Sequence, residues 1–363
     1  MRSLKKFKDL KLAEKIAGKI NAIVSKKRTV MIAGSEQASA LIKYRLKKLI
    51  EEKVNIVYGP GCAACFTPVE MIDKAVSIAL QKDVIMLIYP EILHIPGSKQ
   101  SLYEIQNNGR DVRIINSPLE SVKTAEEDPK KKVVLFATGF ETAAAVNAFT
   151  LLFAQKKGIK NLSILSSQII FHACLEEIVS SSSLPLDGIL IPGDLCTITG
   201  YDVFEPVSQK YKIPLVVGGH EPVDIIMGIY LIAKQIEENQ HKVENQYSRG
   251  TISTGNDEGK KIISQIFEVV SRNLRDTGNV LNSTLKIKKE FTQFDAEKIF
   301  SVKYILPEVS VFCISGKIMR GLSMPDKCSV FGKICIPSHP LGSLMAATDG
   351  ICSTYYKYKP DLT

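Results

Sequence analysis

The chain has 363 residues, of which 45% are hydrophobic and 23% are charged, and its formal net charge at pH 7 is +9. This length allows two or three modest domains, each with its own core. No apolar run reaches the roughly 18 residues that a membrane-spanning helix needs. The basic start also lacks the unbroken apolar stretch of a signal peptide. The composition therefore argues against a membrane or secreted protein and predicts a cytoplasmic one.

The positive charge is concentrated in residues 1–28, which contain ten Lys or Arg against Asp9 and Glu14. This segment carries +8 and leaves only +1 for the rest of the chain. Its apolar residues recur at helical spacing, at Ile16, Ile20, Ile23 and Val24. We therefore expect an amphipathic helix that packs on the body of the protein and exposes its basic face. No nucleic-acid-binding motif accompanies the charge, so neither nucleic acid nor a membrane is expected as a partner.

Short β-branched runs alternate with helical stretches through the first two thirds of the chain, which is typical of parallel sheets covered by helices. Eight runs are predicted to be strands, at residues 29–33, 54–58, 84–89, 112–116, 133–137, 162–166, 188–192 and 214–218. A polar break at 128–132 lies halfway along this series. We therefore expect two sheets of four strands in two similar α/β domains, residues 29–127 and 128–242.

The pattern changes after a helix expected near 223–240. Residues 243–295 are rich in Asn, Lys and Glu and predict helix and loop, whereas 302–358 mix short apolar runs with glycines. This tail holds four cysteines, Cys313, Cys328, Cys335 and Cys352. Because so loop-rich a tail has little regular core, we expect a bound metal centre to order it. Residues 243–363 are thus predicted to form a third, metal-binding region.

The eight cysteines divide into this terminal set, a close pair and two isolated residues. In a reducing compartment such spacing favours metal ligation or redox chemistry over a disulfide framework. Four thiolates can bind an iron–sulfur cluster or a structural zinc ion, and the residues alone do not separate these alternatives. Cys62 and Cys65 have the spacing of a dithiol that closes reversibly, and their glycine-rich loop predicts an accessible pair. Cys174 and Cys196 are interpreted as structural thiols.

Four loops that follow expected strands combine glycine with an ionisable or thiol group, at residues 59–62, 139–142, 192–194 and 218–222. In open parallel sheets, ligands bind beyond the carboxyl ends of the strands, so we expect these loops to face one cleft between the domains. Glu141 can bind a cation or move a proton, but a carboxylate at a helix start also stabilises the helix dipole. Asp194 and His220 carry groups that can bind a metal ion, although each is also a common hydrogen-bonding loop residue.

Five motifs stand in an order and spacing that resemble the HypD family of hydrogenase maturation proteins. They are Gly-Pro-Gly-Cys-Ala-Ala-Cys-Phe-Thr-Pro at 59–68, Gly-Phe-Glu-Thr at 139–142, Val-Glu-Asn-Gln-Tyr-Ser-Arg at 243–249, Phe-Asp-Ala-Glu at 294–297 and Cys-Ser-Val-Phe-Gly-Lys-Ile-Cys at 328–335. The resemblance implies two related α/β domains around a cleft and a third region in which the four terminal cysteines hold a [4Fe-4S] cluster. It also implies that Cys62 and Cys65 are redox-active and that Glu141 is the acidic residue of a catalytic loop.

The family pattern further implies a cytoplasmic scaffold that works with a small HypC-like chaperone and a HypE-like cyanide donor. Together such proteins assemble the Fe(CN)2CO unit of [NiFe]-hydrogenases. The chain departs from this pattern in the expected cleft. Where the family has Cys-Gly-Gly-His, this chain has Gly34-Ser35-Glu36-Gln37, so the thiol that holds the iron is absent. The candidate iron ligands that remain are Cys62, Cys65, Asp194 and His220.

Two functions follow from these observations. The first is a metallocofactor assembly scaffold that builds or transfers the Fe(CN)2CO unit and uses the cluster and the dithiol to pass electrons. The alternative is a dithiol and iron–sulfur redox protein of HypD descent that no longer handles the hydrogenase cofactor. A purely regulatory binding partner is a third and lesser possibility.

Overall fold

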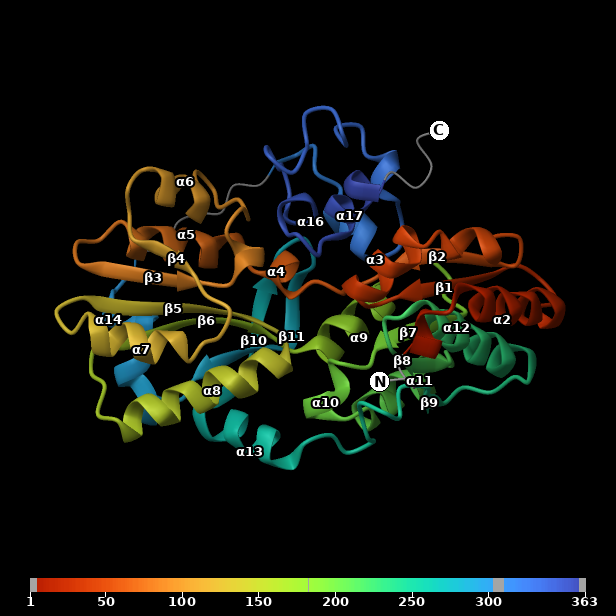
Figure 1. The fold of residues 1–363 in the computed structure, drawn as a ribbon, viewed down its shortest axis with the longest axis horizontal. Helices are drawn as coiled ribbons and strands as arrows, with labels where there is room; N and C mark the ends of the chain where they lie inside the picture. The colour runs from red at the N-terminus through yellow and green to blue at the C-terminus, as the bar shows by residue number, and fades with distance from the viewer. Residues whose placement is uncertain (1–4, 182, 303–309, 359–363) are drawn as a thin grey trace.

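The computed structural model describes residues 5–181, 183–302 and 310–358. Two α/β units lie side by side, and a loop-rich C-terminal region lies over the junction between them (Figure 1). The prediction of an α/β protein with two parallel-sheet units is confirmed, while the iron–sulfur character of the third region stays a prediction. Within the described residues, no helix combines the length and the apolarity needed to cross a membrane.

The first sheet has five parallel strands in the order β2-β1-β7-β8-β9. Alternate residues of its strands face different cores: Val30 and Ile32 pack with one cluster and Met31 with another. Apolar side chains are needed on both faces because helices cover both. The strands are β1 (Arg28–Ile32), β2 (Val54–Tyr58), β7 (Gly188–Pro192), β8 (Leu215–Gly218) and β9 (Val243–Asn245).

The basic N-terminal segment forms the predicted amphipathic helix, which packs on a helix that covers the first sheet. Asp9 caps this helix by accepting a hydrogen bond from the Leu12 amide at 3.2 Å. Its buried residues are Ala13, Ile16, Ala17 and Ile20. The helices of this unit are η1 (Lys6–Lys8), α2 (Leu10–Ile23), α3 (Ser35–Lys43), η2 (Leu46–Leu49), α10 (Cys196–Thr199), η4 (Asp202–Phe204), α11 (Glu205–Tyr211) and α12 (Pro222–Glu237).

The second sheet has six strands in the order β10-β11-β6-β5-β3-β4, of which β10 and β11 are antiparallel additions to a parallel core. Ile85 and Leu87 face one cluster, whereas Met86 and Ile88 face the core shared with the first unit. The strands are β3 (Val84–Ile88), β4 (Val112–Ile114), β5 (Lys132–Gly139), β6 (Leu162–Ile169), β10 (Phe267–Leu274) and β11 (Gly278–Ile287).

Helices cover both faces of the second sheet as well. One face packs against α7, α8 and α13, and the other against α5, α6 and α9. The helices are α4 (Ala63–Phe66), α5 (Val69–Ala79), η3 (Pro90–Ile92), α6 (Leu102–Asn107), α7 (Glu120–Glu127), α8 (Glu141–Lys156), α9 (Phe171–Ser181), α13 (Asp257–Ile266), η5 (Lys289–Phe294) and α14 (Ala296–Ile299).

The predicted division of the strands at residues 128–132 is wrong, so the ranges 29–127 and 128–242 do not delimit the sheets. Strands β3 and β4 lie with β5 and β6, while β1 and β2 lie with β7 and β8. The polar stretch is an ordinary turn from α7 into β5, and Lys132 already pairs with Val84. The chain crosses between units after β2 and again after β6. Short connections look alike in sequence whichever sheet the next strand joins, so periodicity located the strands but not their partners.

Residues 243–295 contain more strand than predicted. Strand β9 completes the first sheet, and β10 and β11 form a hairpin that extends the second. Both hairpin strands carry many exposed polar residues. This composition resembles that of a helix or loop, so the sequence did not predict strands here. The turn of this hairpin points toward the C-terminal region (Figure 1).

The C-terminal region has little regular structure, as predicted. Its side chains join the largest hydrophobic core, which also contains residues of both sheets. The region therefore holds the two units against each other. Its short helices are α15 (Ser315–Met319), η6 (Pro325–Lys327), α16 (Ser343–Ala346) and α17 (Ile351–Tyr358).

Candidate functional site

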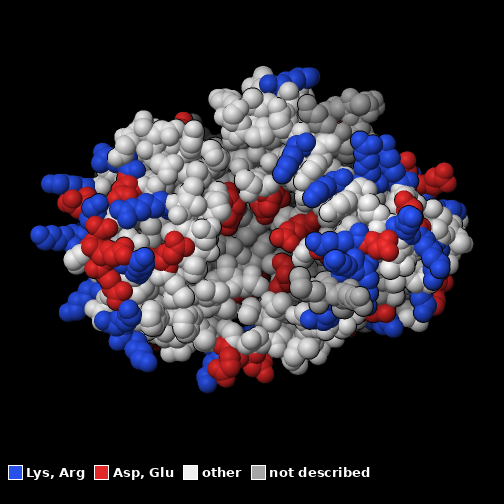
Figure 2. Space-filling view, in the orientation of Figure 1, with Lys and Arg blue, Asp and Glu red and all other residues white. Residues whose placement is uncertain are grey.

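A cavity of about 310 Å³ opens between the two units, at the carboxyl ends of strands from both sheets. Figure 2 shows acidic side chains gathered around a hollow at the centre of this face. Three of the four predicted loops line the cavity, through Gly61, Phe140 and Asp194 among others. The fourth loop, 218–222, contributes no lining residue. The expected cleft is thus confirmed for three of its four loops.

Four carboxylic acids line this cleft, Glu36, Glu91, Asp194 and Asp349, and no Lys or Arg is among its described lining residues. Burial raises the pKa of Asp194, and the charge of Glu36 raises it further. Burial also raises the pKa of Glu91. The pKa of Asp349 rises to about 6, first through burial and then through the nearby charge of Glu91. The cleft is therefore an acidic site in which a positively charged group relieves repulsion.

The loop after β1, where the family pattern has its iron-binding thiol, is closely packed in this chain. Gln37 is 1% exposed, and its amide nitrogen donates to the carbonyl oxygens of Ile191, Gly218 and Gly219 at 3.2, 2.8 and 3.2 Å. A Cβ on Gly34 would lie 2.7 Å from the Gln37 Oε1 atom. Gln37 thus holds the loops after β1, β7 and β8 together. It also occupies the space beside Gly34 in which the side chain of the family's cysteine would lie.

His220 lies beside the cleft and is half-exposed. Its Nδ1 is 3.4 Å from Oε2 of Glu36, and its charge acts to lower the pKa of Asp194. Of the candidate iron ligands, Cys62 and Cys65 are bonded to each other, so neither sulfur is a free thiol in this structure. In the part of the chain that the structure describes, no three His, Cys, Asp or Glu side chains are arranged to hold a single metal ion.

Glu141 is buried in the first turn of α8 and is not among the residues that line the cleft. Its two carboxylate oxygens accept hydrogen bonds from the Phe171 amide at 3.1 and 3.3 Å. The His172 Nδ1 atom lies 3.7 Å from one of them. Glu141 therefore joins the start of α8 to the start of α9, which is a structural contact. Its predicted catalytic role stays a prediction.

Cys62 and Cys65 form a disulfide at the single-turn helix α4. The prediction that this pair is accessible in the cleft is wrong, since Cys62 is 4% exposed and Cys65 is 0% exposed. The residues between them, Ala63 and Ala64, line the cleft instead. The side chain of Cys62 also caps the turn, because its Sγ accepts a hydrogen bond from the Cys65 amide at 3.1 Å. The disulfide thus lies directly behind the cleft wall.

All four C-terminal cysteines line a second, largely apolar cavity under the C-terminal region. Its other walls include Ile318, Val330, Leu344 and Met345. The Leu341 amide donates to the Cys335 Sγ at 3.4 Å, and the Ser315 Oγ lies 3.2 Å from the Cys313 Sγ. A side chain at Gly342 would collide with Cys313, since its Cβ would lie 2.2 Å from that sulfur. We refer to this site as the cysteine cavity.

The residues of the cysteine cavity fit a four-thiolate cofactor. They include four sulfur donors around one water-poor space, backbone and hydroxyl groups directed at the sulfurs, and a glycine where a side chain would intrude. Burial raises the pKa values of Cys313, Cys335 and, most strongly, Cys352, so the free thiols are neutral. Binding of a metal centre must therefore release protons.

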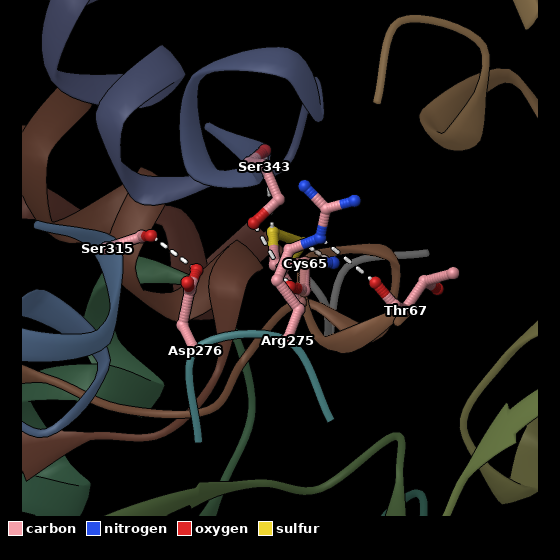
Figure 3. The surroundings of a disulfide bond; sticks show 7 residues. Cys65, Thr67, Arg275, Asp276, Ser315 and Ser343 are labelled. Atoms are coloured by element: carbon pink, nitrogen blue, oxygen red, sulfur yellow. Dashed lines mark hydrogen bonds between the residues drawn. A yellow bond between two sulfur atoms is a disulfide. The ribbon is translucent and has the colours of Figure 1, made fainter. Parts of the chain in front are cut away.

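Two segments connect the disulfide to the cysteine cavity (Figure 3). The hydroxyl of Ser343, which follows Gly342, donates to the Cys65 carbonyl oxygen at 3.0 Å. The β10–β11 turn provides the second connection. The Arg275 amide donates to the Phe66 carbonyl oxygen at 3.1 Å, and Asp276 accepts a hydrogen bond from Ser315, which contacts Cys313. The two sulfur sites are therefore neighbours that share supporting residues.

Sequence reasoning missed Gln37, Asp349, Ser343 and the β10–β11 turn. The turn had a detectable signal, because Arg-Asp-Thr-Gly at 275–278 separates two runs with β-branched residues. Asp276 and Gly278 both adopt positive φ, at 63° and 85°, which Asp and Gly tolerate well. The other three residues carry no signal in a single sequence, since their roles depend on contacts between distant segments.

Comparison with known proteins places these features in one family. The family model HypD, described as "Hydrogenase formation hypA family", matches residues 11–359. Hydrogenase maturation factor HypD1 of Bradyrhizobium diazoefficiens is 34% identical, with 99% of this chain and 97% of the relative covered. HypD of Azotobacter vinelandii is 32% identical with the same coverage, and HypD of Cupriavidus necator is 30% identical over 99% of this chain and 97% of the relative. The chain belongs to the HypD family of hydrogenase maturation proteins.

Proposed function

We propose that this protein is a cytoplasmic scaffold for [NiFe]-hydrogenase maturation, which receives or transfers an Fe(CN)2CO unit as its cargo. Its partners are a HypC-like chaperone and a HypE-like cyanide donor. Membership of the HypD family supports a role in hydrogenase maturation. The observation that carries the mechanism is that the disulfide contacts both other sites: Ala63 and Ala64 within its loop line the cleft, and Ser343, between two residues of the cysteine cavity, donates to the Cys65 carbonyl oxygen.

Cys313, Cys328, Cys335 and Cys352 are the residues that would hold a [4Fe-4S] cluster, which supplies single electrons when bound. The apolar walls of the cavity keep water from these ligands. The Leu341 amide and the Ser315 hydroxyl orient Cys335 and Cys313 through hydrogen bonds to sulfur, a contact that also tunes reduction potential.

The Cys62–Cys65 pair links redox state to the cleft. Reduction breaks the S–S bond with two electrons and leaves two separate sulfurs that can move apart. Ala63 and Ala64 lie between these sulfurs and form part of the cleft wall. A change at the disulfide therefore alters the wall against which the cargo would lie.

The cleft holds its cargo without a thiol of its own. Carboxylates and His220 are weaker ligands for low-spin iron than a thiolate, so the chaperone must supply more of the binding in this protein than where a cleft thiol is present. We expect the complex with the chaperone, and not the isolated chain, to carry the iron unit.

Infrared spectroscopy tests this proposal. The chain is co-produced anaerobically with its HypC- and HypE-like partners, and the purified complex is examined for carbonyl and cyanide stretching bands. Bands present in the complex and absent without the HypE-like donor support the scaffold function. Absence of bands with partners that load another HypD protein contradicts it.

A second function, a dithiol and iron–sulfur redox protein that no longer handles the cofactor, is favoured by one observation. Gln37 fills the space beside Gly34, so the cleft is packed around the missing thiol. This alternative predicts that the infrared spectrum has no carbonyl or cyanide bands. It also predicts that the cysteine cavity and the Cys62–Cys65 pair still exchange electrons.

A further inference from the structure

Among the described residues, the buried guanidinium of Arg275, in the β10–β11 turn, donates hydrogen bonds only to uncharged groups. Arg275 is 7% exposed. Its Nε donates to the Thr67 carbonyl oxygen at 3.0 Å and its Nη2 to the Pro96 carbonyl oxygen at 2.7 Å. A guanidinium remains charged under almost all conditions in proteins, so this charge is buried without a bound anion.

The carboxylates near Arg275 are engaged elsewhere. Asp276 accepts from the Ser315 hydroxyl, and Asp73 accepts from the amide and the hydroxyl of Ser98 at 2.8 and 2.6 Å. Among the described residues, no Asp or Glu oxygen lies within 4.0 Å of its guanidinium. Burial lowers the pKa of Arg275, against the opposing charges of Asp276, Cys313 and Asp73. A buried charge without an opposite charge beside it is strongly destabilising.

The position of Arg275 indicates which negative charge would compensate it. Figure 3 shows its side chain with Nε directed at Thr67, two residues after Cys65 in the segment that carries the disulfide. Its own amide donates to the Phe66 carbonyl oxygen, so both the backbone and the side chain of Arg275 bind residues 66–67, directly after Cys65. The intact disulfide is neutral, whereas reduction creates negative charge on sulfur at this place.

We propose that Arg275 is an electrostatic positioning residue that stabilises the reduced form of the Cys62–Cys65 pair. A dithiol donates two electrons, the S–S bond breaks, one sulfur takes a proton and the other remains a thiolate beside the guanidinium. The dithiol itself becomes a disulfide and releases its protons. The inference rests on the redox role in the proposed function, but it does not require that the protein carry an iron–cyanide unit.

The experiment measures the equilibrium between the pair and dithiothreitol. The whole chain is equilibrated anaerobically at fixed ratios of reduced to oxidised dithiothreitol and quenched by alkylation. The mass of the peptide that contains Cys62 and Cys65 then gives the reduced fraction without interference from the other six cysteines. Arg275→Gln should lower the equilibrium constant for reduction about tenfold, which equals a potential lower by about 30 mV.

Two controls separate charge from packing. Arg275→Lys keeps the charge but loses the planar fork, so we expect it to lower the melting temperature while the constant stays within about threefold of wild type. Arg320→Gln removes a cation that binds the other side of the same turn, through the Asp276 and Thr277 carbonyl oxygens, and should leave the constant unchanged. If Arg275→Gln and Arg275→Lys both lower the melting temperature and neither changes the constant, Arg275 is a structural brace and the inference is wrong.

If Arg275→Gln does not fold, the same equilibrium measurement on Asp276→Asn tests the inference. This variant keeps an acceptor for Ser315 but removes a negative charge close to Arg275, so the constant should rise, by about threefold. An unchanged or lower constant in Asp276→Asn would overturn the inference. Because all of these measurements use the isolated chain, they are independent of the infrared test. If the infrared bands are absent but Arg275→Gln still lowers the equilibrium constant for reduction, the scaffold function is wrong and the inference about Arg275 stands.

Discussion

The cysteine cavity and the cleft between the units differ in the chemistry of their walls. The cavity is apolar, and all four of its predicted thiols face one space. The cleft is lined by four carboxylic acids, and Gly34 stands where the family pattern has a cysteine. All six cysteines predicted to carry the sulfur chemistry are therefore present in this chain, whereas the thiol that the family pattern predicts in the cleft is absent. Because the two sites differ in this way, the predicted sulfur chemistry and the predicted iron chemistry can be tested separately, and one can be wrong without the other.

Loss of one thiol from the cysteine cavity should have the largest effect. Cys335→Ser replaces a sulfur that accepts a hydrogen bond from Leu341 with a poor ligand for iron. We expect wild-type protein prepared anaerobically to hold about four iron and four sulfide per chain, and the variant to hold a small fraction of this. Its melting temperature should also fall, since cofactor binding contributes to folding. Metal and sulfide analysis measures the first effect and calorimetry the second.

Cys174→Ala is the matched control for this prediction. Cys174 is equally buried but lies on α9, outside the cysteine cavity. The variant should lose stability, because a cavity replaces the sulfur, yet keep its iron and sulfide. Zinc in place of iron in the wild type would contradict the cluster, and equal iron in Cys335→Ser would exclude that residue as a ligand.

Substitution of Gly34 tests whether the cleft has closed around its missing thiol. A Cβ at this position would meet Gln37 Oε1 at 2.7 Å and the Pro192 Cβ at 2.9 Å. Gly34→Ala should therefore lower the free energy of unfolding by about 1–3 kcal/mol. Gly18→Ala is the control, since no described atom outside the backbone of its own helix lies within 4 Å of the added Cβ, and the change should be neutral or slightly stabilising.

Gly34→Cys adds a thiol at the same steric cost. In complex with the chaperone it should give stronger iron–cyanide infrared bands than Gly34→Ala, since a thiolate is a better ligand for low-spin iron than the carboxylates around it. Strong bands in the wild type that Gly34→Cys leaves unchanged would mean that other groups in the cleft bind the iron. No bands in either protein, with competent partners, would favour the redox-protein alternative.

The sequence predicted the local elements of this fold well because strand and helix periods are local properties. Eight strands were expected and all eight are present near the predicted residues. The assignment of β3 and β4 to the second sheet was missed, since strand pairing depends on contacts that a single sequence does not display. The β10–β11 hairpin was missed for a different reason, because its many exposed polar residues weaken the alternation on which a strand prediction rests.

The sites divide in the same way. The four terminal cysteines were found because a rare residue type recurs in a short tail, and the structure brings them to one cavity. Asp349 was not found, although it lines the cleft, because it reaches the cleft only through the packing of the C-terminal region. The burial of Cys62 and Cys65 was also unforeseen, since the C-terminal region that covers them is distant in sequence.

The smallest effect should come from the cleft acid Asp349, and it depends on pH. Burial and the charge of Glu91 raise its pKa from the ordinary 3.8 to about 6, and one of its oxygens is buried without a hydrogen-bond partner. The folded protein thus binds more protons than the unfolded chain between about pH 4 and pH 6, so ionisation of Asp349 lowers stability as the pH rises through this window. Asp349→Asn removes the ionisation and should stabilise the protein at pH 8 by about 1–2 kcal/mol, with little effect near pH 4.

Urea unfolding at the two pH values measures this difference. Glu52→Gln, which changes an exposed acid outside the cleft, is the control and should show no such change. Equal stability of Asp349→Asn and wild type at pH 8 would mean that the carboxylate is compensated in the folded protein. The cleft would then be less strained by its acids than its lining suggests, and the contrast with the cysteine cavity would rest on the missing thiol alone.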